Sequence, residues 1–241
     1  MRLIKAHDPR AFDGAAADWV NARVLEKPNS VLALPTGRTP IGLYAELVAR
    51  VHARHLDLTR VMFFNLDEYC GLAIEDPHSY ATFLREHFIT PANIAAESVR
   101  LLQGDASDPV IECSTYDTQL GGYGGLDSCI LGLGVNGHIA FNEPGSAWNQ
   151  RTHRVQLSAS TRALHEQQAR SPWSIPPMGL TMGITTILEA RHILLMVAGS
   201  KKRTALDALY RGKPDIAWPV TSLIEHPDLT VIEFCESVGD R

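Results

Sequence analysis

The chain has 241 residues, of which 45% are hydrophobic and 20% charged, and its formal net charge is -5. This length suits one large α/β domain with a sizeable core, and the acidic balance argues against a general nucleic-acid-binding protein. The N-terminal segment lacks the long apolar stretch of a signal peptide, and no apolar run approaches the length of a membrane span. We therefore expect a cytoplasmic protein whose partners include neither nucleic acid nor a membrane.

The cysteines and the overall layout indicate a single domain whose cysteines are reduced. No CxxC pair occurs, so the sequence favours free thiols in a reducing compartment over a zinc knuckle; the cysteines are Cys70, Cys113, Cys129 and Cys235. There is no internal repeat, and the stretch 104–125, which is richer in Gly, Asp and Ser, is too short for a domain linker. We expect one domain over residues 1–241.

Short apolar runs alternate with longer amphipathic stretches along the chain. In chain order, the pattern predicts a strand at 31–34, a helix at 41–55, a strand at 61–66, a helix at 79–89, a strand at 126–134, a strand at 153–160, a helix at 160–170, a helix at 181–190, a strand at 192–199, a helix at 201–212 and a strand at 229–234. This alternation predicts an α/β fold of Rossmann-like type, a doubly wound, mostly parallel sheet with helices on both faces.

Polar motifs follow four of the predicted strands. They are "PTGRT" at 35–39, "DEY" at 67–69, "GVNGH" at 134–138 and "GSKK" at 199–202. Ligands of open α/β sheets bind outside the carboxyl ends of the strands, so we expect these four motifs to converge on one site.

The motif "LPTGRTP" has the features of a phosphate-binding turn. Gly37 allows close backbone approach, Thr36 and Thr39 offer hydroxyls, and a helix whose amides attract anions begins near Pro40. The motif differs from a P-loop, and an ordinary strand-to-helix turn is the alternative. Lys202 in "GSKK" begins a helix, where a nearby anion would relieve the unfavourable dipole; a solvated surface lysine is the alternative.

In "NLDEYCG", Asp67 and Glu68 follow a buried strand, and we expect one of them to face the cleft. A carboxylate in a cleft can take a proton from carbon. The alternative is a turn in which Glu68 forms a salt bridge.

The run "GLGVNGHIAFNEPG" at 132–145 places His138 and Glu143 five residues apart in a glycine-rich loop. No HExxH motif or second histidine at ligand spacing accompanies it, which disfavours a metal site, and no GxSxG motif indicates a hydrolase triad. The letters of "GLGVNG" fit a dinucleotide fingerprint, but no helix follows. A neutral imidazole oriented by Glu143 suits proton transfer between carbon and oxygen without redox chemistry.

These motifs, together with "DPHSYATF" and "TMGITTIL", resemble in order and spacing the amino-sugar-6-phosphate deaminases, the family of the glucosamine-6-phosphate deaminase/isomerases. The resemblance runs from about residue 30 to the C-terminus, and "NGHIAFNEP" is its most specific part. The related 6-phosphogluconolactonases share the fold, but their loop lacks the pair seen here as Asn142 and Glu143.

The resemblance implies a deaminating aldose–ketose isomerase that acts on a small-molecule sugar phosphate, hydrolyses a C–N bond and needs no cofactor or metal. It implies that His138 helps to open the sugar ring and that Glu143 and Asn136 orient the His138 imidazole. It also implies that Asp67 moves a proton from C2 to C1. The products would be a ketose 6-phosphate and ammonia.

The resemblance also implies the substrate contacts. The 6-phosphate would lie on the loop residues Thr36, Gly37, Arg38 and Thr39, with Lys202 as the counter-charge. Gly132 and the main chain near Ala140 would contact the sugar, and Tyr80 would belong to a lid over the site.

The sequence departs from the family pattern in four places. Asn136 replaces an aspartate, Gln167 stands where an arginine binds phosphate, with Arg162 and Arg170 nearby, and Arg38 replaces a glycine. We hypothesise that Arg38 supplies the missing cation. The C-terminal part is also shorter than in allosteric hexameric members, which argues against control by an N-acetylated sugar phosphate.

Alternatives remain open on the same sequence. The Asn before "GH" and the pair His165–Glu166 also resemble galactosamine-6-phosphate deaminases, which would give tagatose 6-phosphate. Lactone hydrolysis and a sugar-phosphate sensor are further alternatives, disfavoured by the Glu143 context and by the lack of a basic DNA-binding extension. The sequence leaves open whether the chain forms a homo-oligomer.

Overall fold

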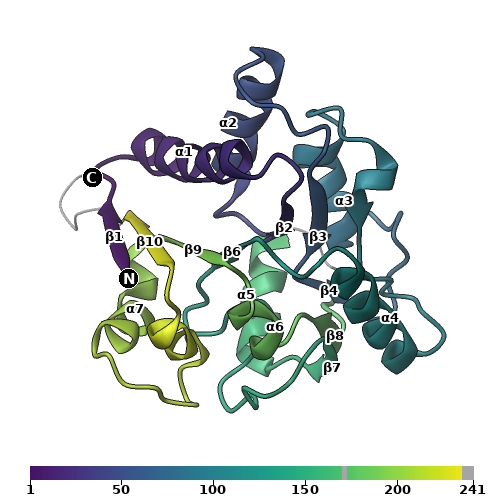
Figure 1. Ribbon diagram of the computed structural model, residues 1–241. Helices are drawn as coiled ribbons and strands as arrows, with labels where there is room; N and C mark the ends of the chain where they lie inside the picture. Colours follow the sequence, from purple (N-terminus) through teal and green to yellow (C-terminus); the bar gives the residue numbers. More distant parts are fainter. Residues whose placement is uncertain (170–172, 235–241) are drawn as a thin grey trace.

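A computed structural model describes residues 1–169 and 173–234, and a seven-stranded sheet crosses its centre (Figure 1). The strand order is β1-β10-β9-β6-β2-β3-β5, and every neighbouring pair is parallel. The strands are β1 (Arg2–Lys5), β2 (Val31–Leu34), β3 (Met62–Asn65), β5 (Val99–Arg100), β6 (Ser128–Gly132), β9 (His192–Ala198) and β10 (Leu229–Phe234).

Helices cover both faces of this sheet. On one face pack α1 (Pro9–Glu26), α2 (Ile41–His52) and α3 (Tyr80–Leu84), which continues into a π-helical turn at Arg85–Ile89. On the other pack α4 (Pro109–Gly122), α6 (Ile184–Leu188) and α7 (Arg203–Tyr210). The described residues also form α5 (Ala159–Ala169) and short 3₁₀ helices at Ala96–Ser98, Ser200–Lys202 and Pro219–Glu225.

The two faces follow from the alternation of side chains along buried strands. In β2, Leu32 and Leu34 join the core under α1 and α2, while Val31 and Ala33 join the core under α4 and α6. Because both faces are covered, the strand is apolar throughout. The predicted doubly wound, mostly parallel fold is confirmed.

A second, three-stranded antiparallel sheet was not expected from the sequence. Its order is β4-β8-β7, formed by β4 (Asp67–Tyr69), β8 (Met178–Thr181) and β7 (His153–Gln156). The prediction of one helix over 181–190 is therefore wrong at its start. Thr181 pairs with both Asp67 and His153, and α6 is shorter than predicted and follows the extended Gly183.

Three of the cysteines, Cys70, Cys113 and Cys129, are free thiols, and Cys235 lies outside the described residues. No helix among residues 1–169 and 173–234 is long and apolar enough to cross a membrane. The same described residues contain no group of three or more His, Cys, Asp or Glu side chains arranged to hold a metal ion.

Candidate functional site

The four polar motifs follow strands that lie side by side. The neighbouring strands β9, β6, β2 and β3 run parallel, with Leu34 opposite Asn65 and Gly132 opposite Met196 near their carboxyl ends. After β2, the chain first places β3 and β5 on one side of it, and then places β6 and β9 on the other side. The strand order thus reverses between β2 and β6, which is where ligands bind in such sheets.

The loop after β2 turns directly into α2. Gly37 has φ +88°, a left-handed conformation that favours glycine, and α2 begins at Ile41 after Pro40. The Thr39 hydroxyl accepts a 3.3 Å hydrogen bond from Lys202 Nζ, so the loops after β2 and β9 meet. Arg38 is exposed at the loop surface.

The two lysines of "GSKK" differ in environment. Lys201 is exposed, whereas burial of Lys202 lowers the pKa of its ammonium group to about 8. A desolvated ammonium beside an anion-attracting helix N-terminus is an arrangement that an anion would stabilise.

Asp67 and Glu68 also lie in contrasting environments. Burial, followed by the nearby Glu68, raises the pKa of the Asp67 carboxyl well above its usual range, and Asp67 Oδ1 has no hydrogen-bond partner among the described residues. Glu68 accepts hydrogen bonds of 2.8 to 2.9 Å from the backbone N–H groups of Tyr69, Tyr80 and Ala81. Glu68 therefore anchors the start of α3 through main-chain amides, while Asp67 keeps an oxygen uncommitted.

Burial raises the pKa of Glu68 to about 7, although its three N–H donors act in the opposite direction. The Asp67 main chain is held separately, because Asn65 Nδ2 donates a 2.8 Å hydrogen bond to the Asp67 carbonyl.

The loop after β6 is folded tightly around His138. Gly134 N–H donates to the His138 carbonyl at 2.9 Å, and a Cβ added at Gly134 would lie 2.5 Å from His138 Nδ1. Ala140 has φ +48°, a strained value for a residue with a side chain, and such strain is frequent at functional sites. Gly132, at the end of β6, faces open space where its Cβ would be.

His138 and Glu143 approach without a direct hydrogen bond. His138 Nδ1 lies 3.9 Å from Glu143 Oε2, and that oxygen accepts a 2.8 Å hydrogen bond from Asn136 Nδ2. The side-chain oxygen Oδ1 of Asn136 accepts a hydrogen bond from the main-chain N–H of His138 at 3.2 Å. Asn136 thus bridges the carboxylate and the histidine backbone, a different arrangement from a Glu143–imidazole hydrogen bond.

The imidazole of His138 is neutral at pH 7. Burial lowers its pKa to about 4, Glu143 acts to raise it, and His165 and Lys202 lower it further. Its Nδ1, like Asp67 Oδ1, is buried without a hydrogen-bond partner in the described part of the chain. Unpaired buried polar atoms are costly, so two in one region indicate a site that a polar ligand completes.

One short segment ties the histidine loop to Asp67. Thr181 pairs with Asp67 across the small sheet, and its hydroxyl accepts a hydrogen bond from Phe141 N–H at 3.1 Å. Asn142 Nδ2 donates to the Met182 carbonyl at 2.9 Å. The buried Asn142 therefore fixes the histidine loop to the main chain of Met182. Thr181 and Met182 together hold both Asp67 and the histidine loop.

Sequence reasoning missed a hydrogen-bonded chain of aromatic side chains. His165 Nδ1 hydrogen-bonds Tyr69 OH at 2.7 Å, and Tyr69 OH hydrogen-bonds Tyr80 OH at 3.0 Å. Burial lowers the pKa of His165, and Glu143 acts in the opposite direction. Only the "HE" pair hinted at His165, and nothing in the sequence linked it to Tyr69, 96 residues away.

No replacement for the phosphate-binding arginine emerges at the expected position. Gln167 is exposed, and Arg170 lies outside the described residues. The Nε atom of Arg162 is buried and has no hydrogen-bond partner among residues 1–169 and 173–234.

The chain is similar to proteins of known kind over nearly its whole length. Residues 10–231 match the family described as glucosamine-6-phosphate isomerases/6-phosphogluconolactonase. A glucosamine-6-phosphate deaminase of Lysinibacillus sphaericus is 39% identical, with 96% of this chain and 98% of the relative covered. One of Thermoanaerobacter pseudethanolicus is 38% identical, with 96% and 92% covered.

Solved structures agree with this assignment. A monomeric glucosamine-6-phosphate deaminase superposes with a TM-score of 0.94 at 34% identity, covering 98% of both chains. A 6-phosphogluconolactonase from Thermotoga maritima shares the fold, with a TM-score of 0.76 at 19% identity, covering 98% of this chain and 99% of the other. The resemblance seen in the sequence motifs is confirmed, and the chain belongs to the glucosamine-6-phosphate isomerase/6-phosphogluconolactonase family.

Proposed function

We propose that the protein converts glucosamine 6-phosphate and water to fructose 6-phosphate and ammonia. The observation that carries the proposal is that a buried carboxyl, Asp67, and a neutral imidazole, His138, lie on segments joined through Thr181, and that each has an uncommitted polar atom. The charge of Lys202, which contacts Thr39 of the loop after β2, acts on the His138 ring. Full-length relatives named glucosamine-6-phosphate deaminase support the same substrate.

The phosphate would bind at the loop between β2 and α2. Lys202 Nζ and the Thr39 hydroxyl already lie 3.3 Å apart, and the N-terminal amides of α2 favour an anion there. We assign the main chain of Thr36, Gly37 and Arg38 to the same contact. Burial disfavours the charged form of Lys202, and a bound phosphate dianion would favour it again.

Ring opening would move a proton from the C1 hydroxyl to the ring oxygen of the sugar, and the neutral imidazole of His138 can accept the first proton and give one to the ring oxygen. Burial lowers the pKa of this imidazole to about 4, so it is neutral before and after the transfer, and Glu143, 3.9 Å away, would stabilise the imidazolium that forms in between. Asn136 holds Glu143 in this position. We assign Gly132 and the strained backbone at Ala140 to contacts with the sugar.

Isomerisation would then use Asp67 as a base. Its carboxylate takes the proton from C2, an enolamine forms, and the proton returns to C1. C1 is reduced from aldehyde to alcohol while C2 is oxidised from amine to imine, so no external oxidant or cofactor is needed. Water adds to the imine and ammonia leaves, which makes the overall reaction hydrolytic at a C–N bond. Tyr80, hydrogen-bonded to Tyr69, would cover the substrate during these steps.

The test is ammonia release from glucosamine 6-phosphate and, in parallel, from galactosamine 6-phosphate, with Asp67→Asn as the control. We expect release from the gluco sugar that disappears in the control. Release from the galacto sugar alone would overturn the substrate assignment. Absence of ammonia from both, with hydrolysis of 6-phosphogluconolactone, would overturn the reaction class.

The solved deaminase is described as monomeric, and we extend this to the present chain. Light scattering should then give a mass near 26.5 kDa. A multiple of that mass would instead support a homo-oligomer.

A further inference from the structure

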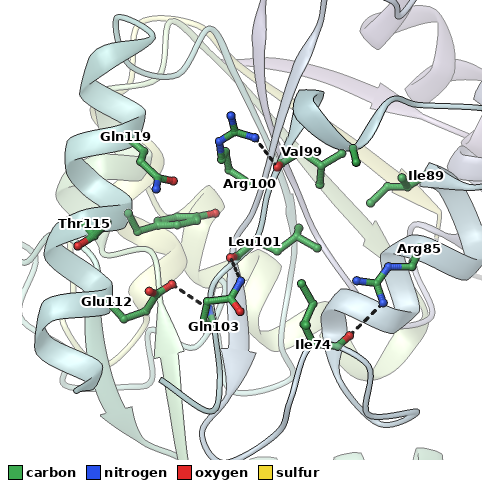
Figure 2. Close-up of a pocket in the computed structure, with 12 residues that line it drawn as sticks. Ile74, Arg85, Ile89, Val99, Arg100, Leu101, Gln103, Glu112, Thr115 and Gln119 are labelled. Carbon is green, nitrogen blue, oxygen red and sulfur yellow. Dashed lines mark hydrogen bonds between the residues drawn. The ribbon is translucent and has the colours of Figure 1, made fainter. Parts of the chain in front are cut away.

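A cavity of about 330 Å³ lies between α4, β5 and the segment from Ile74 to Ile89 (Figure 2). Apolar side chains of Ile74, Val99 and Leu101 line one part, and Arg85 and Arg100 add positive charge. Its size is at the lower end for small-molecule sites, which fits a ligand of roughly ten to fifteen non-hydrogen atoms. The residues proposed above for catalysis and phosphate binding do not line it.

The two arginines lack an acidic partner among the residues that the structure describes. Arg85 donates a 3.1 Å hydrogen bond to the Ile74 carbonyl, and Arg100 donates to the Val99 and Glu97 carbonyls at 2.8 and 3.0 Å and to Tyr123 OH at 3.2 Å. None of these acceptors is a carboxylate. Each guanidinium has five N–H donors, so both retain donors for a ligand.

The acidic residue of the cavity is already engaged in a hydrogen bond with another residue that lines it. Glu112, on the α4 side, accepts a 2.8 Å hydrogen bond from Gln103 N–H, as Figure 2 shows. Two guanidinium groups against one engaged carboxylate leave the cavity with a net positive charge. Together with its apolar part, this favours an organic anion over a sugar or a cation.

A buried contact connects the cavity to Asp67. Tyr116, a buried cavity residue, donates its hydroxyl to the carbonyl and to Oδ1 of Asn65 at 2.7 and 2.9 Å. Asn65 Nδ2 in turn donates to the Asp67 carbonyl. A ligand that displaces the Tyr116 ring would therefore disturb the support of the proposed base.

A second contact connects the cavity to Tyr80. The Ile74 carbonyl, which Arg85 binds, also accepts hydrogen bonds from the hydroxyls of Ser79 and Thr82 at 3.3 and 3.1 Å. Those residues flank Tyr80 at the start of α3. A ligand that binds Arg85 would compete with the Ile74 carbonyl for the guanidinium group. It would thereby alter the position of the segment that leads into Tyr80.

We propose that this cavity is an effector site for a small organic carboxylate with an apolar body, coupled to the active site through Tyr116–Asn65 and through Arg85–Ile74. The coupling rests on the proposed function; binding itself does not. The ligand's carboxylate would lie on the arginines and its apolar body on Ile74, Val99 and Leu101.

Binding can be tested with 3-phenylpropanoate as the probe and its neutral amide as the matched compound. At a concentration about tenfold above Kd, the carboxylate should raise the melting temperature by about 3 °C or more, and the amide should not. Equal shifts with both compounds, or no shift and no heat of binding with either, would overturn the proposal.

Two variants locate the site. Thr115→Trp places a large ring at the exposed mouth of the cavity and should abolish the shift, whereas Thr118→Trp, on the same helix outside the lining, should retain it. Arg100→Gln should weaken binding at least about tenfold, which corresponds to loss of one charged hydrogen-bond partner. Unchanged binding in both Thr115→Trp and Arg100→Gln would place the probe elsewhere.

Coupling is then read from ammonia release by the wild-type protein. Saturating carboxylate should change KM or kcat for the amino-sugar phosphate at least twofold, and the change should vanish in Thr115→Trp but persist in Thr118→Trp. Carboxylate binding at this cavity with unaltered kinetics would overturn the effector role. Absence of ammonia release without any ligand would instead count against the proposed function, and the binding result would stand.

Discussion

Asn136 Nδ2 donates a 2.8 Å hydrogen bond to Glu143 Oε2, the same oxygen that lies 3.9 Å from the imidazole of His138. The neutral amide thus holds the carboxylate near a ring whose pKa burial has lowered to about 4. An aspartate at this position would bring a second negative charge to the ring.

We therefore expect Asn136→Asp to raise the pKa of His138, because a nearby negative charge favours the imidazolium. The titration of the His138 ring protons followed by NMR measures this directly. Asn136→Ala, which removes the hydrogen bond without adding charge, is the matched variant. A pKa that does not rise in Asn136→Asp would refute this electrostatic role of residue 136.

Asp67→Asn should lower the rate of ammonia release at least about 10²-fold, because an amide cannot act as a base. The same change should stabilise the fold by about 1 kcal/mol near neutral pH, since it replaces a buried carboxylate that lacks a partner at Oδ1. This combination of lost activity and gained stability separates a functional carboxyl from a structural one.

The sign of the pH effect follows from the raised pKa of Asp67. The folded state holds this proton more tightly than the unfolded state, so the contribution to stability is complete below the unfolded pKa and is lost as pH rises through the folded pKa. The stability gap between Asp67→Asn and wild type should widen with pH in denaturant titrations. Asp57→Asn is the control of opposite sign, because hydrogen bonds from Thr59 lower the pKa of Asp57. A stability gap between Asp67→Asn and wild type that narrows with pH would refute the raised pKa of Asp67.

The sheet could be predicted from the sequence because its central strands are buried on both faces. Runs such as 31–34 and 193–198 are apolar throughout, and no helical periodicity competes with them. The edge strand β1 was missed, since its burial is slight and its residues are mixed.

Two long helices were missed although each carries a start signal. Asp8 accepts from Ala11 N–H at 2.7 Å and Asp108 accepts from Val110 N–H at 2.8 Å, and a proline follows each cap. The buried face of α1 includes Ala16 and Ala17, which give a weak apolar pattern. Capping chemistry would have found both helices where periodicity did not.

The site was predictable only where its parts follow strand ends. The motifs around Asp67, His138 and Lys202 fall there, and parallel pairing brings strand ends together. The small antiparallel sheet and the contact of His165 with Tyr69 depend on pairings between distant segments. Local sequence carries no signal for such contacts.

Gly134→Ala should lower kcat by about 10²-fold while the fold is retained. The added Cβ would lie 2.5 Å from His138 Nδ1, so the ring must move, and a displacement of about 1 Å has this order of effect. Gly121→Ala, on α4 with no atom within 4 Å of the new Cβ, is the control and should leave kcat unchanged. Circular dichroism and kcat of both variants decide the matter; equal kcat values would show that the ring position is not critical.

Arg38→Gly should raise KM at least several-fold if the exposed Arg38 provides the cation that Gln167 cannot. Arg38→Lys should restore part of the loss, because the charge returns without the planar guanidinium. The KM of the wild type should also rise with salt more steeply than that of Arg38→Gly. A KM that is the same in all three proteins would assign the phosphate charge to Lys202 alone.

Lys202→Met should raise KM by roughly 10- to 100-fold with a smaller effect on kcat, since a hydrogen bond between charged groups contributes about 1.5–3 kcal/mol to binding. Lys201→Met, at the exposed neighbouring position, is the matched control. Because burial lowers the pKa of Lys202 to about 8, the wild-type KM should rise as pH passes this value, and Lys202→Met should not show that rise. Phosphate restores the charged form when it binds, so wild-type binding above pH 8 should take up a proton, measurable as a buffer-dependent heat of binding. Were Lys201→Met to raise KM and Lys202→Met to leave it unchanged, the anion site would have to be centred on the surface rather than at Thr39.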